Sequence, residues 1–169
     1  DELLADIRML EAALHDGGSG NLADLLVRPI RREIETFRFS TVRLDLRENA
    51  ARLTQAVVAL WRAATGRTDD PPASDSEEWK LWLLAELARP RRAEQPLERY
   101  PEEVRETIGM FRLVREMRAE LDREAFGSFV LSMTREVADV LGAYLLAKEG
   151  GLFADEAGTE SSTLPIVPL

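Results

Sequence analysis

Apolar residues recur along most of the chain at intervals of three and four, the spacing that places them on one face of a helix. The pattern predicts six helices, which cover residues 2–15, 22–37, 48–65, 77–89, 101–121 and 134–149. Pro29 lies inside the second helix and predicts a kink or a short break, because proline has no backbone N–H to donate. Helices are therefore expected to dominate the structure.

Three segments depart from this spacing and predict β-strands. Residues 37–47 alternate between apolar and polar side chains, 127–133 form a short apolar run, and 164–168 form another. The middle run is typical of a strand that is buried on both faces. The order of strand, three helices, strand, helix and strand favours a parallel α/β arrangement, because parallel strands need long connections.

One face of the first predicted strand is charged. Leu44 and Leu46 point to one side of it, and Arg43, Asp45 and Arg47 point to the other. An Arg–Asp ladder of this kind can satisfy its own charges within a sheet. Alternatively, an arginine near the carboxyl end of a strand presents paired planar donors to a phosphate or a carboxylate. Spacing alone favours the ladder and leaves the anion site open.

The composition narrows the classes of function. The 169 residues include 22 Lys and Arg, 31 Asp and Glu and no Cys, which gives a formal charge of −9. The absence of Cys excludes a disulfide scaffold and thiolate metal sites, and the acidic balance argues against nucleic acid or an anionic membrane as partner. No apolar run approaches the roughly 20 residues that cross a bilayer. We therefore expect one domain over residues 1–169, located in the cytoplasm.

Side chains with catalytic chemistry are few. His15 is the single histidine, and no partner motif accompanies it. The glycines at 17, 18 and 20 follow no strand and precede no lysine, so they do not make a phosphate-binding loop. The acidic residues between Asp69 and Glu78 are interpreted as a solvated loop and the charged start of a helix rather than as a metal site.

Several blocks of the sequence resemble phosphoenolpyruvate carboxylases of the bacterial type. Residues 36–49, TFRFSTVRLDLREN, resemble the family's "TFG…LVRLDIRQES". Residues 126–133 and 138–141 look like its "FGAYVISM…SDVL", and 78–87 are similar to its "EWLLSEL". The order and spacing of the blocks agree with the family, and residues 167–169 fit the start of its "VPLFE" block.

This resemblance implies a segment of a (β/α)8-barrel enzyme that joins bicarbonate to phosphoenolpyruvate, giving oxaloacetate and phosphate. The parent enzyme would use Mg²⁺ or Mn²⁺ to hold the enolate and arginines to hold the anionic groups. By its place in the motif, Arg47 is the residue expected to bind the substrate phosphate, with Arg43 and Asp45 as supports within the strand. No catalytic residue and no metal ligand is expected here, since the family's metal-binding Glu would come two residues after Leu169.

The sequence also departs from the family pattern. Glu48 stands where Gln is usual and Ala50 where Ser is usual, and a carboxylate is an unfavourable neighbour for an anion-binding arginine. The family's catalytic His motifs, its Gly-Tyr-Ser-Asp-Ser segment and its Arg-Gly-Gly loop have no counterpart. Because the chain also starts at Asp1 without Met and ends on an apolar run, we expect an internal segment that is inactive alone.

Two alternatives of another class remain open. The chain could be a free-standing, non-catalytic helical interaction module derived from the barrel, or a module that binds phosphoenolpyruvate or a related metabolite. In a segment separated from its barrel, the three short strands would leave unpaired edges. The expected partners are therefore the remainder of the barrel or, through self-association, a second copy of the chain.

Overall fold

The computed structural model describes residues 2–38, 43–122, 124–156 and 159–169. The chain divides into two compact units, Asp1–Arg43 and Leu44–Leu169, and each is described here by itself. The interpretation of residues 1–169 as one domain stays a prediction. No helix among the described residues is long and apolar enough to span a membrane.

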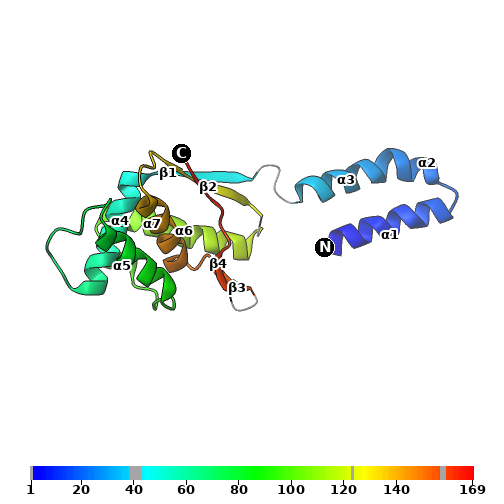
Figure 1. Cartoon of the computed structure of the whole chain (residues 1–169). Coiled ribbons are helices and arrows are strands. Elements are labelled where there is room, and N and C mark those ends of the chain that lie inside the picture. Colours follow the sequence, from blue (N-terminus) through cyan, green and yellow to red (C-terminus); the bar gives the residue numbers. More distant parts are fainter. Residues whose placement is uncertain (1, 39–42, 123, 157–158) are drawn as a thin grey trace. The chain divides into compact units, whose positions relative to one another are not determined.

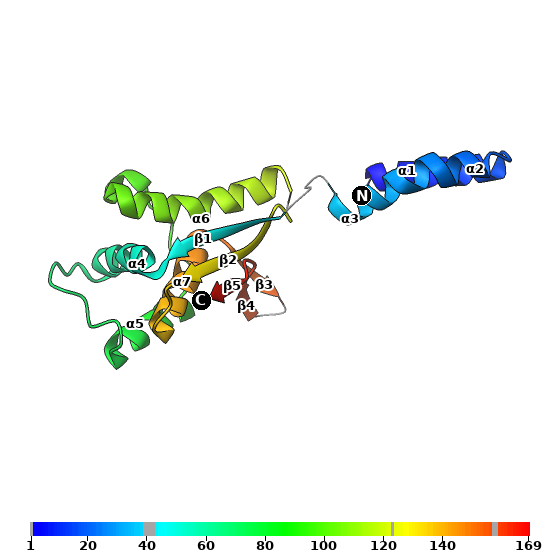
Figure 2. The same ribbon diagram turned by 90° about the horizontal axis from the view of Figure 1, so that it is seen from above.

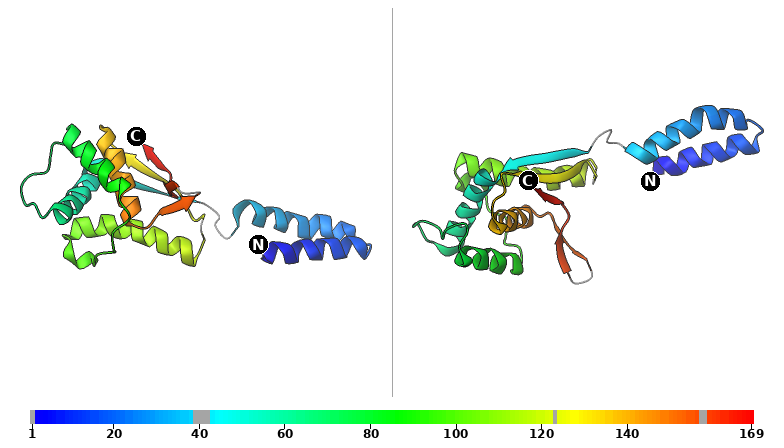
Figure 3. Two further views of the ribbon diagram at one scale, coloured as in Figure 1. Left: turned by 60° about the horizontal axis from the view of Figure 1, so that its bottom comes forward. Right: turned by 45° about the horizontal axis from the view of Figure 1, so that its top comes forward.

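The first unit is a helical hairpin. Its elements are α1 (Glu2–Asp16), α2 (Gly20–Leu22), a π-helical turn η1 (Ala23–Val27) and α3 (Arg28–Phe37). The helices α1 and α3 run side by side in opposite directions (Figure 3). The break expected near Pro29 is the π-helical turn, in which the N–H of Arg28 donates to the carbonyl of Ala23. Pro29 then lies in the first turn of α3, where its missing N–H costs little.

The second unit combines helices with a small parallel sheet (Figure 1). Its elements in chain order are β1 (Leu44–Asn49), α4 (Ala50–Thr65), α5 (Glu77–Ala88), η2 (Leu97–Arg99), α6 (Glu102–Glu120), β2 (Phe126–Ser132), α7 (Val137–Glu149), β3 (Phe153–Glu156), β4 (Thr159–Ser162) and β5 (Ile166–Pro168). The expectation of a helix-dominated α/β structure with three short parallel strands and about six helices is confirmed.

The three parallel strands lie in the order β1-β2-β5, with β2 in the middle (Figure 2). Leu46 and Ile166 are the partners of Phe129 on either side, so these three side chains share one face of the sheet. Arg47 pairs with Val130, which places Arg47 on the opposite face. Phe129, Val130 and Leu131 are all buried, as the apolar run at 127–133 predicts.

The core lies between the Phe129 face of the sheet and the helices. Phe129 contacts Phe111 of α6, with the ring centroids 5.0 Å apart. Helices α4 and α7 approach so closely that a Cβ on Gly142 would lie 3.1 Å from a methyl group of Val57. Both Phe111 and Phe129 are fully buried, and the core therefore fastens the sheet to α4, α6 and α7.

A buried lysine joins three elements. Lys148 of α7 is 1% exposed, and its ammonium group donates to the carbonyl of Leu87 at the end of α5 and pairs with Glu160 of β4. This pair holds the antiparallel β3–β4 hairpin, which lies between the helix predicted to end at residue 149 and the strand predicted to begin at residue 164. The sequence pattern predicts no strand in between because it cannot anticipate a contact between Lys148 and Glu160.

The start of the first strand differs from the prediction. Phe37 is the last residue of α3, as predicted for the helix over 22–37, and it does not start a strand, because β1 begins at Leu44. Positions 39–42 of the predicted strand lie outside the described residues. At its other end, β1 continues to Asn49, whose side chain accepts a hydrogen bond from the N–H of Ala51 at 2.8 Å and so caps α4.

One predicted helix start also needs correction. The helix predicted to begin at Thr134 begins at Val137, and the hydroxyl of Thr134 donates to the carbonyl of Leu131. A capping box between Glu136 and Asp139 starts that helix instead. Val137 is therefore the first residue of the helix, and it is exposed.

We expect Phe129→Ala to lower the free energy of unfolding of the second unit by about 3–5 kcal/mol, because it opens a cavity in the core. The three Trp residues all lie in this unit, so their fluorescence during urea denaturation measures the change. Leu81→Ala is the matched control, since Leu81 is 58% exposed on α5. Equal losses for the two variants would contradict this account of the core.

Candidate functional site

The carboxyl ends of the three parallel strands meet at one edge of the sheet. The hydroxyl of Ser132 donates to the carbonyl of Glu48 at 3.1 Å, which ties the end of β2 to the end of β1. The N–H of Thr134 donates to the carbonyl of Leu169 at 2.8 Å, which ties the end of β2 to the end of β5. These two hydrogen bonds therefore hold the ends of the three strands together at this edge.

Arg47 lies two residues before the end of β1, on the face opposite the core. Its neighbours across the sheet are Val130 and then Val167, so an exposed guanidinium stands at the end of an apolar row. The helices of the described core pack on the other face, against Phe129 and Leu131. An arginine placed in this way has its donors available to an anion that approaches the open face.

Asp45, one of the two predicted supports, lies two residues before Arg47 on β1 and therefore on the same face of the strand. The carboxylate of Asp45 accepts a hydrogen bond from the N–H of Ser128 at 2.8 Å. This bond joins β1 to β2 at the point where the register between them shifts. Arg43 precedes β1 and is exposed. Asp45 thus fastens β1, the strand that carries Arg47, to β2. This bond explains the position of Arg47 without a direct contact between Arg47 and Asp45.

Glu48 follows Arg47 in sequence but points to the other face. Its side chain is only 14% exposed, accepts a hydrogen bond from the N–H of Asn49 at 2.8 Å and lies 3.9 Å from Arg52. Arg52 in turn pairs with Glu106 at 2.8 Å. The carboxylate of Glu48 is therefore directed to α4 and away from the face that carries Arg47.

A pocket of about 680 Å³ opens beside the same edge. Its lining comes from the end of β1, the start of α4, the loop before α5 and the segment after β2. The polar and charged residues of this lining include Asn49, Thr54, Asp75, Arg135, Glu136 and Asp139. The sequence did not single out Arg135, because no motif and no periodic face contains it. Arg47 does not line this pocket, so the structure places the predicted arginine on the sheet face next to it.

The described part of the chain contains no group of three or more His, Cys, Asp or Glu side chains that could hold a metal ion. The divalent metal that the resemblance implies for the parent enzyme therefore finds no set of ligands among these residues. The acidic residues Asp69 and Asp75 do not form such a group. Asp69 pairs with Arg67 at 2.6 Å, and Asp75 lies in the loop before α5.

Comparison with known proteins identifies the family. The family model described as phosphoenolpyruvate carboxylase matches residues 1–169. The chain belongs to the phosphoenolpyruvate carboxylase family. A phosphoenolpyruvate carboxylase of Methylorubrum extorquens is 58% identical over 173 aligned residues and is matched by 100% of this chain. The phosphoenolpyruvate carboxylases of Nocardia farcinica and Chromobacterium violaceum are 35% and 33% identical and are matched by 99% of the chain.

The chain spans only part of these relatives. It covers 19% of the length of the Methylorubrum extorquens phosphoenolpyruvate carboxylase and 18% of the other two. The sequence resemblance to the family is confirmed, and it extends over the helical hairpin as well as over the blocks around Arg47.

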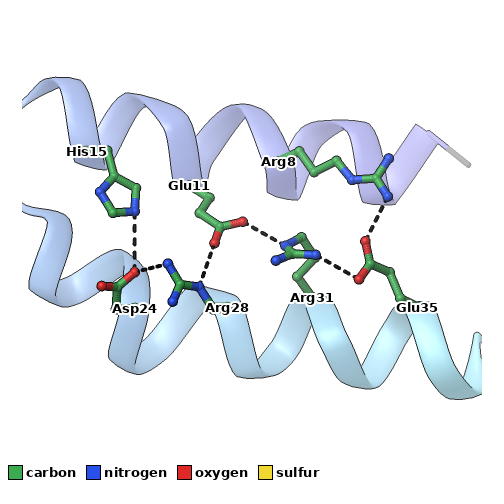
Figure 4. Close-up of polar contacts among 7 residues, drawn as sticks. All are labelled: Arg8, Glu11, His15, Asp24, Arg28, Arg31 and Glu35. Carbon is green, nitrogen blue, oxygen red and sulfur yellow. Dashed lines mark hydrogen bonds and ion pairs between the residues drawn. The ribbon is translucent and has the colours of Figure 1, made fainter.

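Outside the sheet, a run of ion pairs lines the contact between α1 and α3 of the phosphoenolpyruvate carboxylase segment (Figure 4). Basic side chains and carboxylates alternate along it in the order His15, Asp24, Arg28, Glu11, Arg31, Glu35 and Arg8. The two central bonds run from Arg31, whose guanidinium contacts Glu11 and Glu35 at 2.7 Å each. His15 thus ends a structural network, which agrees with the absence of a catalytic partner for it.

This network changes the acidity of its carboxyl groups. The hydrogen bond from Arg31 lowers the pKa of Glu11 from its ordinary value of 4.5, and the bond from Arg8 lowers the pKa of Glu35. A carboxylate whose pKa is lower in the folded state stabilises that state at any pH above the unfolded pKa. The stabilisation is lost as the pH falls through the folded pKa.

We therefore expect the hairpin of α1 and α3 to lose helix content as the pH falls below about 4. Carbon chemical shifts of residues 2–37, measured by NMR between pH 7 and pH 2, report this loss. Glu11→Gln should weaken the hairpin at pH 7 and flatten the acid response, because the neutral amide keeps no charge for Arg31. Glu33→Gln, on the exposed side of α3, is the matched control and should behave like the unchanged chain. Identical pH profiles for Glu11→Gln and the unchanged chain would refute the assignment.

Proposed function

We propose that this chain supplies a substrate-binding arginine to an enzyme that carboxylates phosphoenolpyruvate with bicarbonate, giving oxaloacetate and phosphate. The observation that carries the proposal is the position of Arg47, exposed on the open sheet face near the carboxyl ends of parallel strands. Family membership supports the reaction class. The assignment of Arg47 rests on its place in the VRLDLR block and on this position in the sheet.

Arginine suits the role because its planar guanidinium offers five donors in a fixed geometry and stays charged at every physiological pH. Two of these donors can bind two oxygens of one phosphate group at once. At Arg47 they would hold the phosphate of phosphoenolpyruvate and stabilise the charge that the leaving phosphate carries. A group fixed on a strand makes this interaction with little reorganisation, which favours catalysis.

The supporting role proposed for Asp45 follows from its place on β1, and the one proposed for Arg43 follows from its place in the VRLDLR block. The bond from the N–H of Ser128 to Asp45 fixes the register of β1 on β2. Both would act on substrate through the position of Arg47 rather than by contact.

We further propose that β1, β2 and β5 are consecutive strands of a (β/α)8 barrel. Their parallel pairing and the intervening helices fit that architecture, in which active sites form at the carboxyl ends of the strands. In a closed barrel the face that carries Arg47 would point to the interior. The metal that holds the enolate would be bound by residues of the parent enzyme outside those described here.

In the full-length natural enzyme, Arg47→Ala should reduce kcat/KM for phosphoenolpyruvate by about two orders of magnitude, mainly by removing donors to the phosphate. Steady-state kinetics at saturating bicarbonate measure the effect. Asp45→Asn is the control for position, because its amide oxygen can still accept from Ser128, and it should cost less than about tenfold. Unchanged kinetics for Arg47→Ala would remove this residue from the site.

The 169-residue chain by itself should show no turnover of phosphoenolpyruvate with Mg²⁺ and bicarbonate, because the described residues provide no metal ligands. Coupled oxaloacetate reduction, followed by absorbance, measures the rate. The full-length enzyme at equal concentration is the positive control. If the chain alone turned over phosphoenolpyruvate, the proposal of inactivity would be overturned. If Arg47→Ala then abolished this turnover, the role proposed for Arg47 would still stand.

A further inference from the structure

A second pocket lies at the opposite end of α4 from the strand edge. It has a volume of about 650 Å³ and is lined by the end of α4, the loop after it, the segment around η2 and the end of α7. Because α4 starts at the carboxyl end of β1 and rises about 1.5 Å per residue, its far end is about 20 Å from that edge. The pocket is therefore separate from the site that carries Arg47.

Positive charge dominates the lining of this pocket. Four arginines from three separate segments line it, and Glu149 is its single described acidic residue; the arginines are Arg62, Arg67, Arg92 and Arg99. This local positive charge contrasts with the formal charge of −9 of the whole chain. Pockets of about 300–1,000 Å³ are the usual size for small-molecule sites.

Existing ion pairs hold the arginines in place without using all their donors. Arg67 gives its Nε and one Nη to Asp69, at 3.0 and 2.6 Å, and its guanidinium lies 5.0 Å from the ring centre of Trp61. Arg92 donates from one Nη to the buried carboxylate of Glu86. A guanidinium has five N–H donors, so each arginine retains donors for a further acceptor.

The other two arginines of the lining, Arg62 and Arg99, interact less strongly with neighbouring side chains. Arg99 donates from one Nη to the side-chain oxygen of Gln95 at 2.8 Å, which is a neutral partner. Arg62 lies close enough to Asp69 to help lower the pKa of that carboxyl group. Neither arginine is the partner of a buried carboxylate in the described residues, so their charge is available to a ligand.

The remaining polar groups of the lining favour an anion. Burial raises the pKa of Glu149, which shifts this group toward its neutral form despite the nearby Arg92 and Arg91. Burial also raises the pKa of Tyr100, so its hydroxyl remains a hydrogen-bond donor. The lining thus combines four arginines and a hydroxyl donor with one carboxyl group whose pKa burial raises.

We propose that this pocket binds a small polyanion whose charges are carried by phosphate or carboxylate groups, with Arg62 and Arg99 as its main contacts. Arginine recognises both groups through the same paired N–H donors, so the geometry assigns the class of ligand rather than one compound. The site is independent of the proposed carboxylation chemistry, because no residue of its lining belongs to the face that carries Arg47.

Calorimetric titration of the full-length natural protein with inorganic pyrophosphate, and separately with citrate, tests the proposal. All proteins in the experiment carry Arg47→Ala, so that the strand edge does not contribute to binding. Arg62→Gln combined with Arg99→Gln should weaken binding of at least one probe by about tenfold or more. Arg32→Gln, which removes one positive charge from the exposed side of α3 as Arg62→Gln does from the pocket, should leave the affinity within about twofold.

The single variant Arg62→Gln guards against misfolding of the double variant, and circular dichroism checks both. It should weaken binding by about threefold or more, since Arg62 holds no buried carboxylate. Dependence on Arg62 and Arg99 with pyrophosphate alone would assign the site to phosphate groups, and with citrate alone to carboxylates. Affinity that neither variant changes, or no saturable binding of either probe up to about 10 mM, would overturn the proposal.

Discussion

The pairing of β2 with a parallel strand on each side is the constraint on which the second unit depends. β2 presents Phe129 and Leu131 to the helices, and its backbone binds β1 and β5. Because both neighbours run parallel to it, the carboxyl ends of all three strands must meet at one edge. The core therefore determines where Arg47 lies, although Arg47 itself is exposed and is not part of that core. A change in the register of β1 by one residue would send Arg47 into the core and Leu46 to the open face.

The same alternation resolves the electrostatic conflict between Arg47 and Glu48. In sequence the two are adjacent, and a carboxylate there is unfavourable for binding an anion. In the structure they lie on opposite faces. The carboxylate of Glu48 accepts a hydrogen bond from the N–H of Asn49 and lies near the guanidinium of Arg52. A Gln at this position could accept the same N–H bond, so the departure from the family pattern affects the junction with α4 more than the face of Arg47.

Periodicity predicted the elements whose apolar stripe is packed, such as α4 and α6, because burial there follows the stripe. It failed where a long-range contact replaces the local signal, as at the β3–β4 hairpin, which Lys148 and Glu160 hold. In α1, Leu3 and Leu10 follow the helical spacing of apolar residues but are exposed, and Glu11 lies at the contact with α3.

The candidate residues divide in the same way. Arg47 was accessible to sequence reasoning because one short block contains it. The arginines of the second pocket come from positions 62–99 and converge only through the packing of α4 against α6 and α7. No pattern along the chain could bring them together before the fold was known.

Arginine accounts for twenty of the 22 basic residues, and this choice explains how an acidic chain keeps local basic sites. A lysine presents one compact charge. In Lys148 the ammonium group donates to the carbonyl of Leu87 and pairs with the carboxylate of Glu160. An arginine can bind a carboxylate and still direct further donors elsewhere. Arg31 uses this capacity to join two carboxylates in the hairpin, and Arg67 uses it to face a pocket while paired with Asp69. The formal charge counts each pair as neutral, whereas an incoming anion meets the donors that the pair leaves unused. Net charge therefore excludes a large basic surface but not a small anion site.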